Sequence, residues 1–208
     1  MNARQAVEPT VHSGSDPRLT SSTQAIMARI QREARDHPLH QLMIVGAARG
    51  VGASFVAGQT AAQLADAGLA PVLVVEVAGS QEGEQDLSGP AQSRDRDPGR
   101  DVSRIRLSAD TCLRLFSAGK GGGEGLPEAW RQAFELVLWD VPPPTVTPVS
   151  LAMARRMDGT MLVVHANRTR RQVAQHVAGR LEDSGGRLLG VVLNRTVNYI
   201  PEWIYRWL

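Results

Sequence analysis

The sequence predicts an α/β fold built on a mainly parallel β-sheet with helices on both faces, and three observations lead to it. Short apolar runs alternate with longer segments of helical character along most of the chain. The apolar residues in these runs are consecutive, as in strands that are buried on both faces. A glycine-rich turn stands directly between the first run and the following helical segment, an arrangement typical of a phosphate-binding loop.

Composition bounds the class of protein. The chain has 208 residues, 42% of them apolar, which is enough for one domain with a buried core. The formal charge of +2 gives no basis for a nucleic-acid partner. The single cysteine, Cys112, excludes an internal disulfide and suits a reducing compartment. No apolar run is long enough to span a membrane, and residues 1–22 lack the apolar stretch of a secretory signal.

The N-terminal region divides into an arm and a helix. Residues 1–22 are polar and interrupted by proline and glycine, so we expect a flexible arm, with residues 23–208 forming the folded domain. Over residues 23–35, Ile26 and Ile30 recur at helical spacing beside a face of arginines. That arginine face is expected either to be solvated or to bind a partner.

The first strand, the first helix of the sheet and the second strand follow in order. Residues 42–45 are apolar at consecutive positions, and so are residues 72–77 apart from Glu76, so both segments are expected to be buried strands. Between them, the alanine-rich residues 53–67 predict a helix. Gly68 is expected to end this helix, because glycine is favoured just beyond a helix C-terminus.

The middle of the chain is less regular. Residues 79–101 are almost entirely polar or small and predict a long mobile loop. Two short strands are expected at residues 104–107 and 113–116. Residues 119–125 are a second glycine-rich stretch, which we expect to be a linker because no strongly buried strand precedes it.

The second half continues the alternation. Strands are expected at residues 134–140, 160–165 and 188–194, and helices at residues 127–133, 149–157 and 169–183. The tail, residues 199–208, contains both tyrosines and two of the four tryptophans. If it is helical, its apolar face either closes the core of the domain or binds a partner or a membrane surface.

The motif that carries chemistry is the run GAARGVGAS after the first strand. Backbone N–H groups at Gly50, Val51, Gly52 and Ala53 can converge on a phosphate at the N-terminus of the next helix, and the Ser54 hydroxyl can hold Mg²⁺. The phosphate-loop pattern requires lysine where Ala53 stands. Without that charge-assisted contact, worth about 1.5–3 kcal/mol, nucleotide affinity should fall about ten- to a hundredfold.

Two carboxylates and one arginine accompany this motif. Asp140 ends a predicted strand and is expected to hold Mg²⁺ together with Ser54, while a simple capping role in the following proline turn is the alternative. Glu76, at the end of an earlier strand, is a second carboxylate that could reach the site. Arg49 lies in the loop and could replace part of the missing positive charge.

These features together resemble the cytoplasmic domain of the bacterial tyrosine kinases of capsule and exopolysaccharide synthesis, which are deviant P-loop ATPases related to chromosome- and septum-positioning proteins. The resemblance covers roughly residues 23–208 and is most specific in the second half, where FELVLWDVPPP is similar to the family's magnesium-binding strand. It implies a P-loop NTPase-like fold, with ATP or ADP and Mg²⁺ as ligands. It also implies that Asn194 contacts the adenine ring.

The chain departs from the family pattern at several positions. Ala53 replaces the loop lysine, and Ala48 replaces the additional signature lysine of the deviant loops. The motif of the second strand, expected as Asp-x-Asp, reads EVA and lacks its second aspartate. In the Glu-x-x-Arg-x-x-Arg oligomerisation motif, Ile26 replaces the glutamate, whereas Arg29 and Arg32 remain.

The resemblance and its departures lead to one main hypothesis. The chain would be a non-catalytic, tyrosine-kinase-like cytoplasmic partner or regulator of a membrane polysaccharide co-polymerase, held at the inner membrane through that partner. Homo-oligomers, as relatives form, are a further expectation. The first alternative is an active tyrosine autokinase or ATPase that uses Arg49 or Lys120 in place of the lysine. The second is a positioning ATPase, against which the small net charge counts.

Overall fold

The computed structural model describes residues 26, 28–30, 32–33, 38–78, 101–117 and 128–195. The predicted arm, most of the predicted loop at residues 79–101, the linker at residues 119–125 and the tail lie outside the described residues. The elements, in chain order, are β1 (Gln41–Gly46), α2 (Ala53–Asp66), β2 (Val72–Ala78), β3 (Val102–Ser108), α3 (Ala109–Ser117), α4 (Glu128–Ala133), β4 (Leu136–Val141), α5 (Val149–Ala154), β5 (Gly159–His165), α6 (Arg171–Asp183) and β6 (Leu188–Asn194).

The sheet has six strands in the order β3-β2-β4-β1-β5-β6, and every pairing is parallel. The predicted α/β fold is therefore confirmed. β1 lies at the centre between β4 and β5, and all six of its residues are buried. Because the strands are parallel, the loops that follow β1, β2 and β4 emerge at one edge of the sheet, where ligands bind in open α/β folds.

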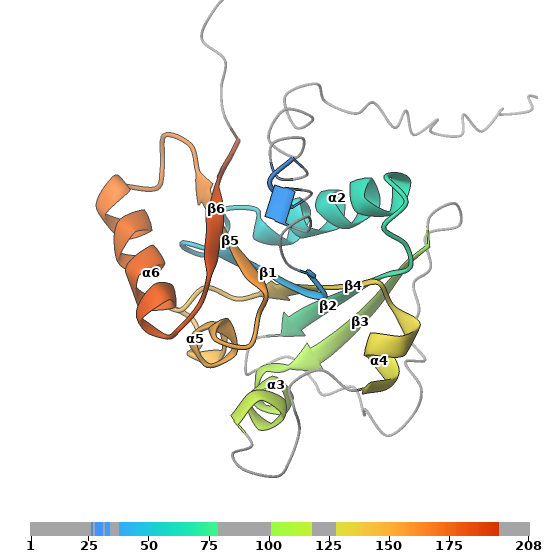
Figure 1. The fold of residues 1–208 in the computed structure, drawn as a ribbon. Helices are drawn as coiled ribbons and strands as arrows, with labels where there is room; N and C mark the ends of the chain where they lie inside the picture. Colours follow the sequence, from blue (N-terminus) through green and yellow to red (C-terminus); the bar gives the residue numbers. More distant parts are fainter. Residues whose placement is uncertain are drawn as a thin grey trace, which may run out of the picture.

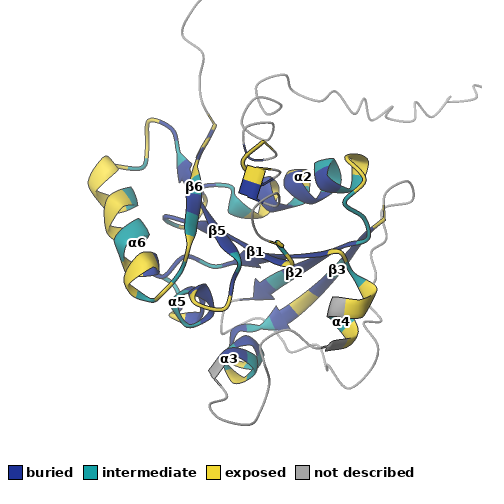
Figure 2. Ribbon diagram, viewed as in Figure 1, coloured by how far each residue is buried: buried dark blue, intermediate teal, exposed yellow. Residues whose placement is uncertain are grey.

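Helices cover both faces of the sheet (Figure 1). One apolar cluster joins α2 and the N-terminal helical residues to the sheet, and a second joins α3, α5 and α6 to the opposite face. Figure 2 shows the strands buried between helices whose outer surfaces are exposed. Among the described residues, no helix is both long and apolar enough to cross a bilayer.

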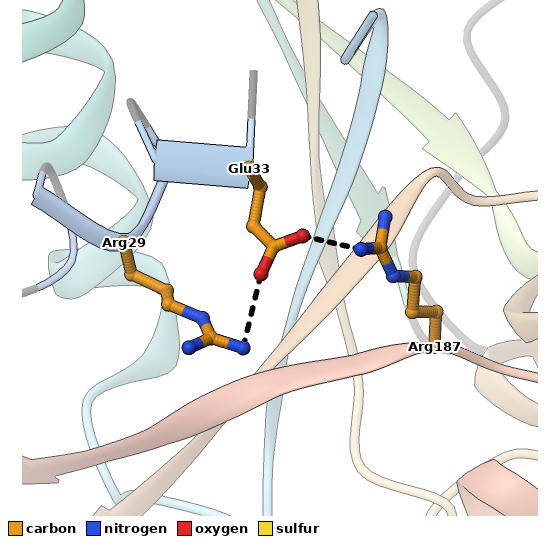
Figure 3. A network of polar contacts seen from close by, with 3 residues as sticks. All are labelled: Arg29, Glu33 and Arg187. Atoms are coloured by element: carbon orange, nitrogen blue, oxygen red, sulfur yellow. Dashed lines mark hydrogen bonds and ion pairs between the residues drawn. The ribbon is translucent and has the colours of Figure 1, made fainter. Parts of the chain in front are cut away.

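The N-terminal helical residues pack as the sequence pattern predicts. Ile26 and Ile30 are each 2% exposed and lie in the same apolar cluster as α2, whereas Arg29 and Arg32 are exposed. Glu33 is buried and accepts from two guanidinium groups, Arg29 at 3.0 Å and Arg187 just before β6 (Figure 3). The pair with Arg187 connects the N-terminal helical residues to a segment far along the chain.

The expected strand at residues 113–116 is wrong, because this segment lies in helix α3. The side-chain hydroxyl of Ser108 accepts a hydrogen bond from the backbone N–H of Thr111 at 3.1 Å, which caps the helix N-terminus. Cys112 and Phe116, four residues apart, are buried on one face of the helix. The rings of Phe116 and Trp139 pack edge-to-face, with their centroids 5.2 Å apart. A four-residue segment with three apolar residues was too short to separate a strand from one helical turn.

Candidate functional site

The phosphate-loop geometry is present between β1 and α2. Gly50 and Gly52 have φ angles of 73° and 86°, in the left-handed region that favours glycine. Gly52 is the N-cap of α2 and supplies no side-chain hydrogen bond to the helix. The first backbone N–H groups of α2 lack intrahelical acceptors, so they remain available to an anion.

This loop forms one wall of a pocket of about 300 Å³, and the end of β4 with its proline turn forms another. Its lining residues include Arg49, Gly50, Val51, Gly52, Ala53, Ser54 and Asp140. The Ala53 methyl group lines the pocket where the loop pattern requires lysine. Among the described lining residues, Arg49 carries the one basic side chain, and that residue is exposed.

Asp140 and Ser54 meet in this pocket. Burial raises the pKa of the Asp140 carboxyl above its ordinary value, and a hydrogen bond with the Ser54 hydroxyl partly opposes this effect. The Glu76 carboxylate raises the same pKa further, and the Arg104 guanidinium lowers it. A serine hydroxyl and a carboxylate are hard oxygen donors, so this pair fits a hydrated Mg²⁺ that a nucleotide would bring.

Glu76, the second expected carboxylate, lies beside Asp140 but is already paired. The sheet register places Glu76 between Asp140 on β4 and Arg106 on β3. Its carboxylate oxygens lie 3.2 Å from the Arg106 guanidinium and 3.9 Å from the Arg104 guanidinium. These ion pairs leave Glu76 as a poorer metal ligand than a free carboxylate.

Sequence reasoning did not predict the contribution of β3. Arg104 and Arg106 are two residues apart on β3, so both lie on the sheet face that carries α2. The guanidinium of Arg104 reaches that helix at Gly58. A Cβ atom at Gly58 would lie 3.3 Å from an Arg104 nitrogen, so glycine there makes room for the guanidinium. The alternating Arg-x-Arg pattern was visible, but only the strand order shows that it lies next to Glu76.

Asn194, at the end of β6, also reaches the loop. Its side chain is 4% exposed, and its Nδ2 donates a hydrogen bond to the carbonyl oxygen of Val51 at 2.8 Å. Its Oδ1 accepts from the backbone N–H of Arg195 at 2.8 Å. The structure thus brings Asn194 to the expected site, where it contacts the loop itself.

Other chemistry-bearing side chains lie away from this constellation. The Nδ1 of His165 is 2.6 Å from the Ala166 carbonyl oxygen, as expected for a structural histidine at a strand end. In the part of the chain that the structure describes, no group of three or more His, Cys, Asp or Glu side chains could hold a metal ion. Mg²⁺ binding here would therefore depend on oxygens that a phosphate ligand and water supply.

Comparison with known proteins gives sequence matches over a short stretch and fold matches over most of the chain. No family model matches the chain. A stretch of 68 residues, 33% of this chain, is 31% identical to the tyrosine-protein kinase CpsD of Streptococcus agalactiae serotype III. That stretch spans only 29% of the length of this relative.

Solved structures match over most of the chain. The kinase domain of the Escherichia coli tyrosine kinase ETK has a TM-score of 0.73 at 18% identity, covering 95% of this chain and 84% of that one. The VpsO kinase domain has a TM-score of 0.66 at 24% identity, covering 87% of this chain and 97% of that one. A nucleotide-binding protein from Archaeoglobus fulgidus, in complex with ADP, has a TM-score of 0.52 at 16% identity and covers 84% of this chain and 74% of that one. The chain thus has the α/β, P-loop NTPase-like fold of bacterial tyrosine-kinase domains.

Proposed function

We propose that this chain is a non-catalytic, tyrosine-kinase-like protein of exopolysaccharide synthesis that acts by binding a membrane co-polymerase. One observation carries the proposal: the pocket keeps its loop backbone and the Ser54–Asp140 pair, while Ala53 presents a methyl group where a cation is required. Phosphoryl transfer depends on positioning and on neutralising the charge of the phosphates. Here the positioning elements remain and the main neutralising group is missing.

The state of Glu76 supports the same proposal. A free carboxylate beside Asp140 could serve as a further metal ligand or as a base in phosphoryl transfer. Here Arg104 and Arg106 from β3 pair with Glu76. The charge of that carboxylate is thus balanced within the chain.

The proposed partner follows from the sequence resemblance described above and from the similarity to the kinase CpsD over 68 residues. The chain would act in the cytoplasm, at the inner membrane, through the cytoplasmic segment of the co-polymerase. Co-purification of the two proteins from detergent extracts tests this step. Deletion of the chain should alter polymer yield or length, and an unchanged polymer together with no co-purification would contradict the proposal.

Calorimetric titration with Mg-ATP tests the loss of the cation. The wild-type chain is expected to bind weakly or not at all, and Ala53→Lys is expected to gain about ten- to a hundredfold in affinity. Gln59→Lys is the matched control, since it adds the same charge at an exposed position of α2 outside the pocket lining. Micromolar binding by the wild type, unchanged in Ala53→Lys, would show that another group already replaces the lysine.

The observation that Arg49 lines the pocket favours an active autokinase or ATPase as the alternative function. Phosphate release and phosphotyrosine formation at Tyr199 or Tyr205 would then be measurable with the wild-type chain. Both signals should disappear in Arg49→Gln and in Asp140→Asn. Our proposal expects neither signal above that of the variants.

A further inference from the structure

We infer that the tail of the chain, residues 196–208, docks on an exposed apolar surface at the β6 edge of the sheet. This surface consists of Val173, Val191 and Leu193, and we call it the β6 surface. None of these residues lines the phosphate-loop pocket, so the inference is independent of the proposed function. Exposure, strand position and the sequence of the tail support it.

The β6 surface stands out by the clustering of its exposed side chains. Val191 and Leu193 are each 52% exposed, and Val173 is 39% exposed. Among the described residues, the one other large apolar side chain with comparable exposure is Phe55 on α2. A single exposed apolar residue is ordinary, whereas three on one surface point to an interaction site.

The β6 surface continues the apolar core of the domain. Val191 is in register with Leu162 of β5, and Leu193 with Val164, so each pair lies on the same face of the sheet. Both β5 residues belong to the apolar cluster under α5 and α6. α6 runs in the opposite direction to β6, so Val173 in its first turn lies at the end of the sheet where β6 ends (Figure 1). The core therefore reaches the β6 edge without being fully covered there.

The two edge strands of the sheet differ in how they are protected. β3 forms one edge and β6 the other. β3 carries Arg104 and Arg106, and charged side chains are a common protection against pairing with other chains. β6 reads LLGVVLN and has no charged residue. An uncharged edge strand is usually protected by a covering segment, so β6 is expected to have one.

The tail is the segment best placed to cover β6. It begins directly after Arg195, whose φ of 55° turns the chain out of the extended strand conformation. Residues 196–202 would span up to about 23 Å when extended, which is about the length of β6. Residues 203–208 can therefore reach any part of the β6 surface.

The sequence of the tail has the matching chemistry. Its apolar residues include Trp203, Ile204, Trp207 and Leu208. In a helix that begins at Pro201, these four side chains share one face, and proline is favoured at the first helical position. Tryptophan rings supply a large apolar area, which suits a surface of small aliphatic side chains.

Photo-cross-linking of the full-length protein tests the docking. A benzoylphenylalanine in place of Leu193 should cross-link to peptides within residues 199–208 of the same chain. The same residue in place of Glu182, an exposed position at the other end of α6, is the control and should not cross-link to the tail. Isotope-labelled and unlabelled copies are mixed, so that links between copies are recognised by mass. Links from position 193 to a second copy, or no link to the tail, would overturn the inference.

Hydrogen exchange measured by mass spectrometry gives an independent test. Leu193→Asp should speed backbone exchange in residues 199–208 about fivefold or more, because the charge disrupts an apolar contact. Phe55→Asp places the same charge at another exposed apolar position and should leave the tail at the wild-type rate. Unprotected exchange of the tail in the wild type, or no change in Leu193→Asp, would contradict docking.

The tail itself provides a variant for the case in which Leu193→Asp does not fold. Trp203→Ala combined with Trp207→Ala leaves β6 unchanged and should lower the cross-linking yield from position 193 about fivefold or more. Tyr205→Phe keeps a large ring in the tail and should retain the wild-type yield. An unchanged yield in the double tryptophan variant would overturn the inference.

Discussion

At the residue scale, the two glycines of the phosphate loop differ in what surrounds them. Both have positive φ angles, 73° for Gly50 and 86° for Gly52, but a Cβ at Gly50 would have no neighbour within 4 Å among the described residues. A Cβ at Gly52 would contact the buried amide of Asn194. The left-handed conformation is therefore the main constraint at Gly50, and close packing adds to it at Gly52.

We predict unequal costs for two alanine substitutions in this loop. Gly50→Ala should lower the free energy of unfolding by about 1–2 kcal/mol, the cost of a left-handed conformation. Gly52→Ala should cost about 1–3 kcal/mol more, because it must also displace the Asn194 amide from its partner. Urea denaturation measures both values, and equal costs would contradict the packing argument.

Asp140 gives a prediction with a defined dependence on pH. Since burial raises the pKa of Asp140 in the folded state, ionisation of this carboxyl destabilises the fold as the pH rises through the raised pKa. Asp140→Asn, which resembles the neutral form, should be more stable than the wild type at pH 7. The difference should vanish below the ordinary aspartate pKa of 3.8, where the carboxyl is protonated in both states.

Thermal unfolding of the two proteins between pH 3 and pH 8 checks this outcome. Asp66→Asn, at an exposed position near the end of α2, is the control and should show no comparable gain. A stability loss in Asp140→Asn at pH 7 would mean that the carboxylate is favoured in the folded state, contrary to its burial.

At the element scale, the N-terminal helix belongs to the core of the domain. Its buried residues, Ile26 and Ile30, lie in the cluster that also contains α2. Its acidic residue, Glu33, pairs with Arg187 near the start of β6. Arg29, which the sequence resemblance assigns to an oligomerisation motif, pairs with Glu33 of its own chain. Homo-oligomer formation through this helix remains a prediction.

We predict that the packing of this helix contributes measurably to stability. Ile30→Ala should lower the free energy of unfolding by about 2–4 kcal/mol, because a fully buried aliphatic side chain is removed from a packed cluster. Arg32→Ala, on the exposed side of the same helix, should change it by less than about 0.5 kcal/mol. Chemical denaturation gives both values. Similar small effects would mean that the helix is only loosely attached.

At the scale of the whole molecule, Cys112 reports on opening of the core. Cys112 is 0% exposed in the cluster that joins α3 to the sheet, and burial raises the pKa of its thiol from 9.0 to about 12. The thiolate is the reactive form of cysteine. A thiol reagent at pH 8 should therefore label the native protein only as fast as the molecule opens.

The same shift predicts a loss of stability in alkali. The unfolded chain releases the thiol proton near pH 9, whereas the folded chain retains it until about pH 12. Stability from this group is thus fully present below pH 9 and falls as the pH rises toward 12. The difference in unfolding free energy between wild type and Cys112→Ala should shrink over this range. A pH-independent difference would contradict the burial of the thiol.

Most of the architecture could be predicted because local patterns agreed with the tertiary fold. Consecutive apolar runs at β1, β2 and β5 could be buried only in a parallel sheet covered on both faces. α3 was missed because the four residues 113–116, three of them apolar, fit a strand or one helical turn equally well. The Ser108 cap and the spacing of Cys112 and Phe116 distinguish the two.

The sequence by itself determined the α/β class, the position of the phosphate loop and the replacement of its lysine by Ala53, because these depend on residues that are neighbours along the chain. Only the tertiary structure placed Arg104 and Arg106 beside Glu76, since that contact depends on β3 pairing with β2. Likewise, only the folded chain brought Asn194 to Val51 across 143 positions of sequence. Local periodicity determines which residues are buried, whereas contacts between distant polar groups depend on strand order and register.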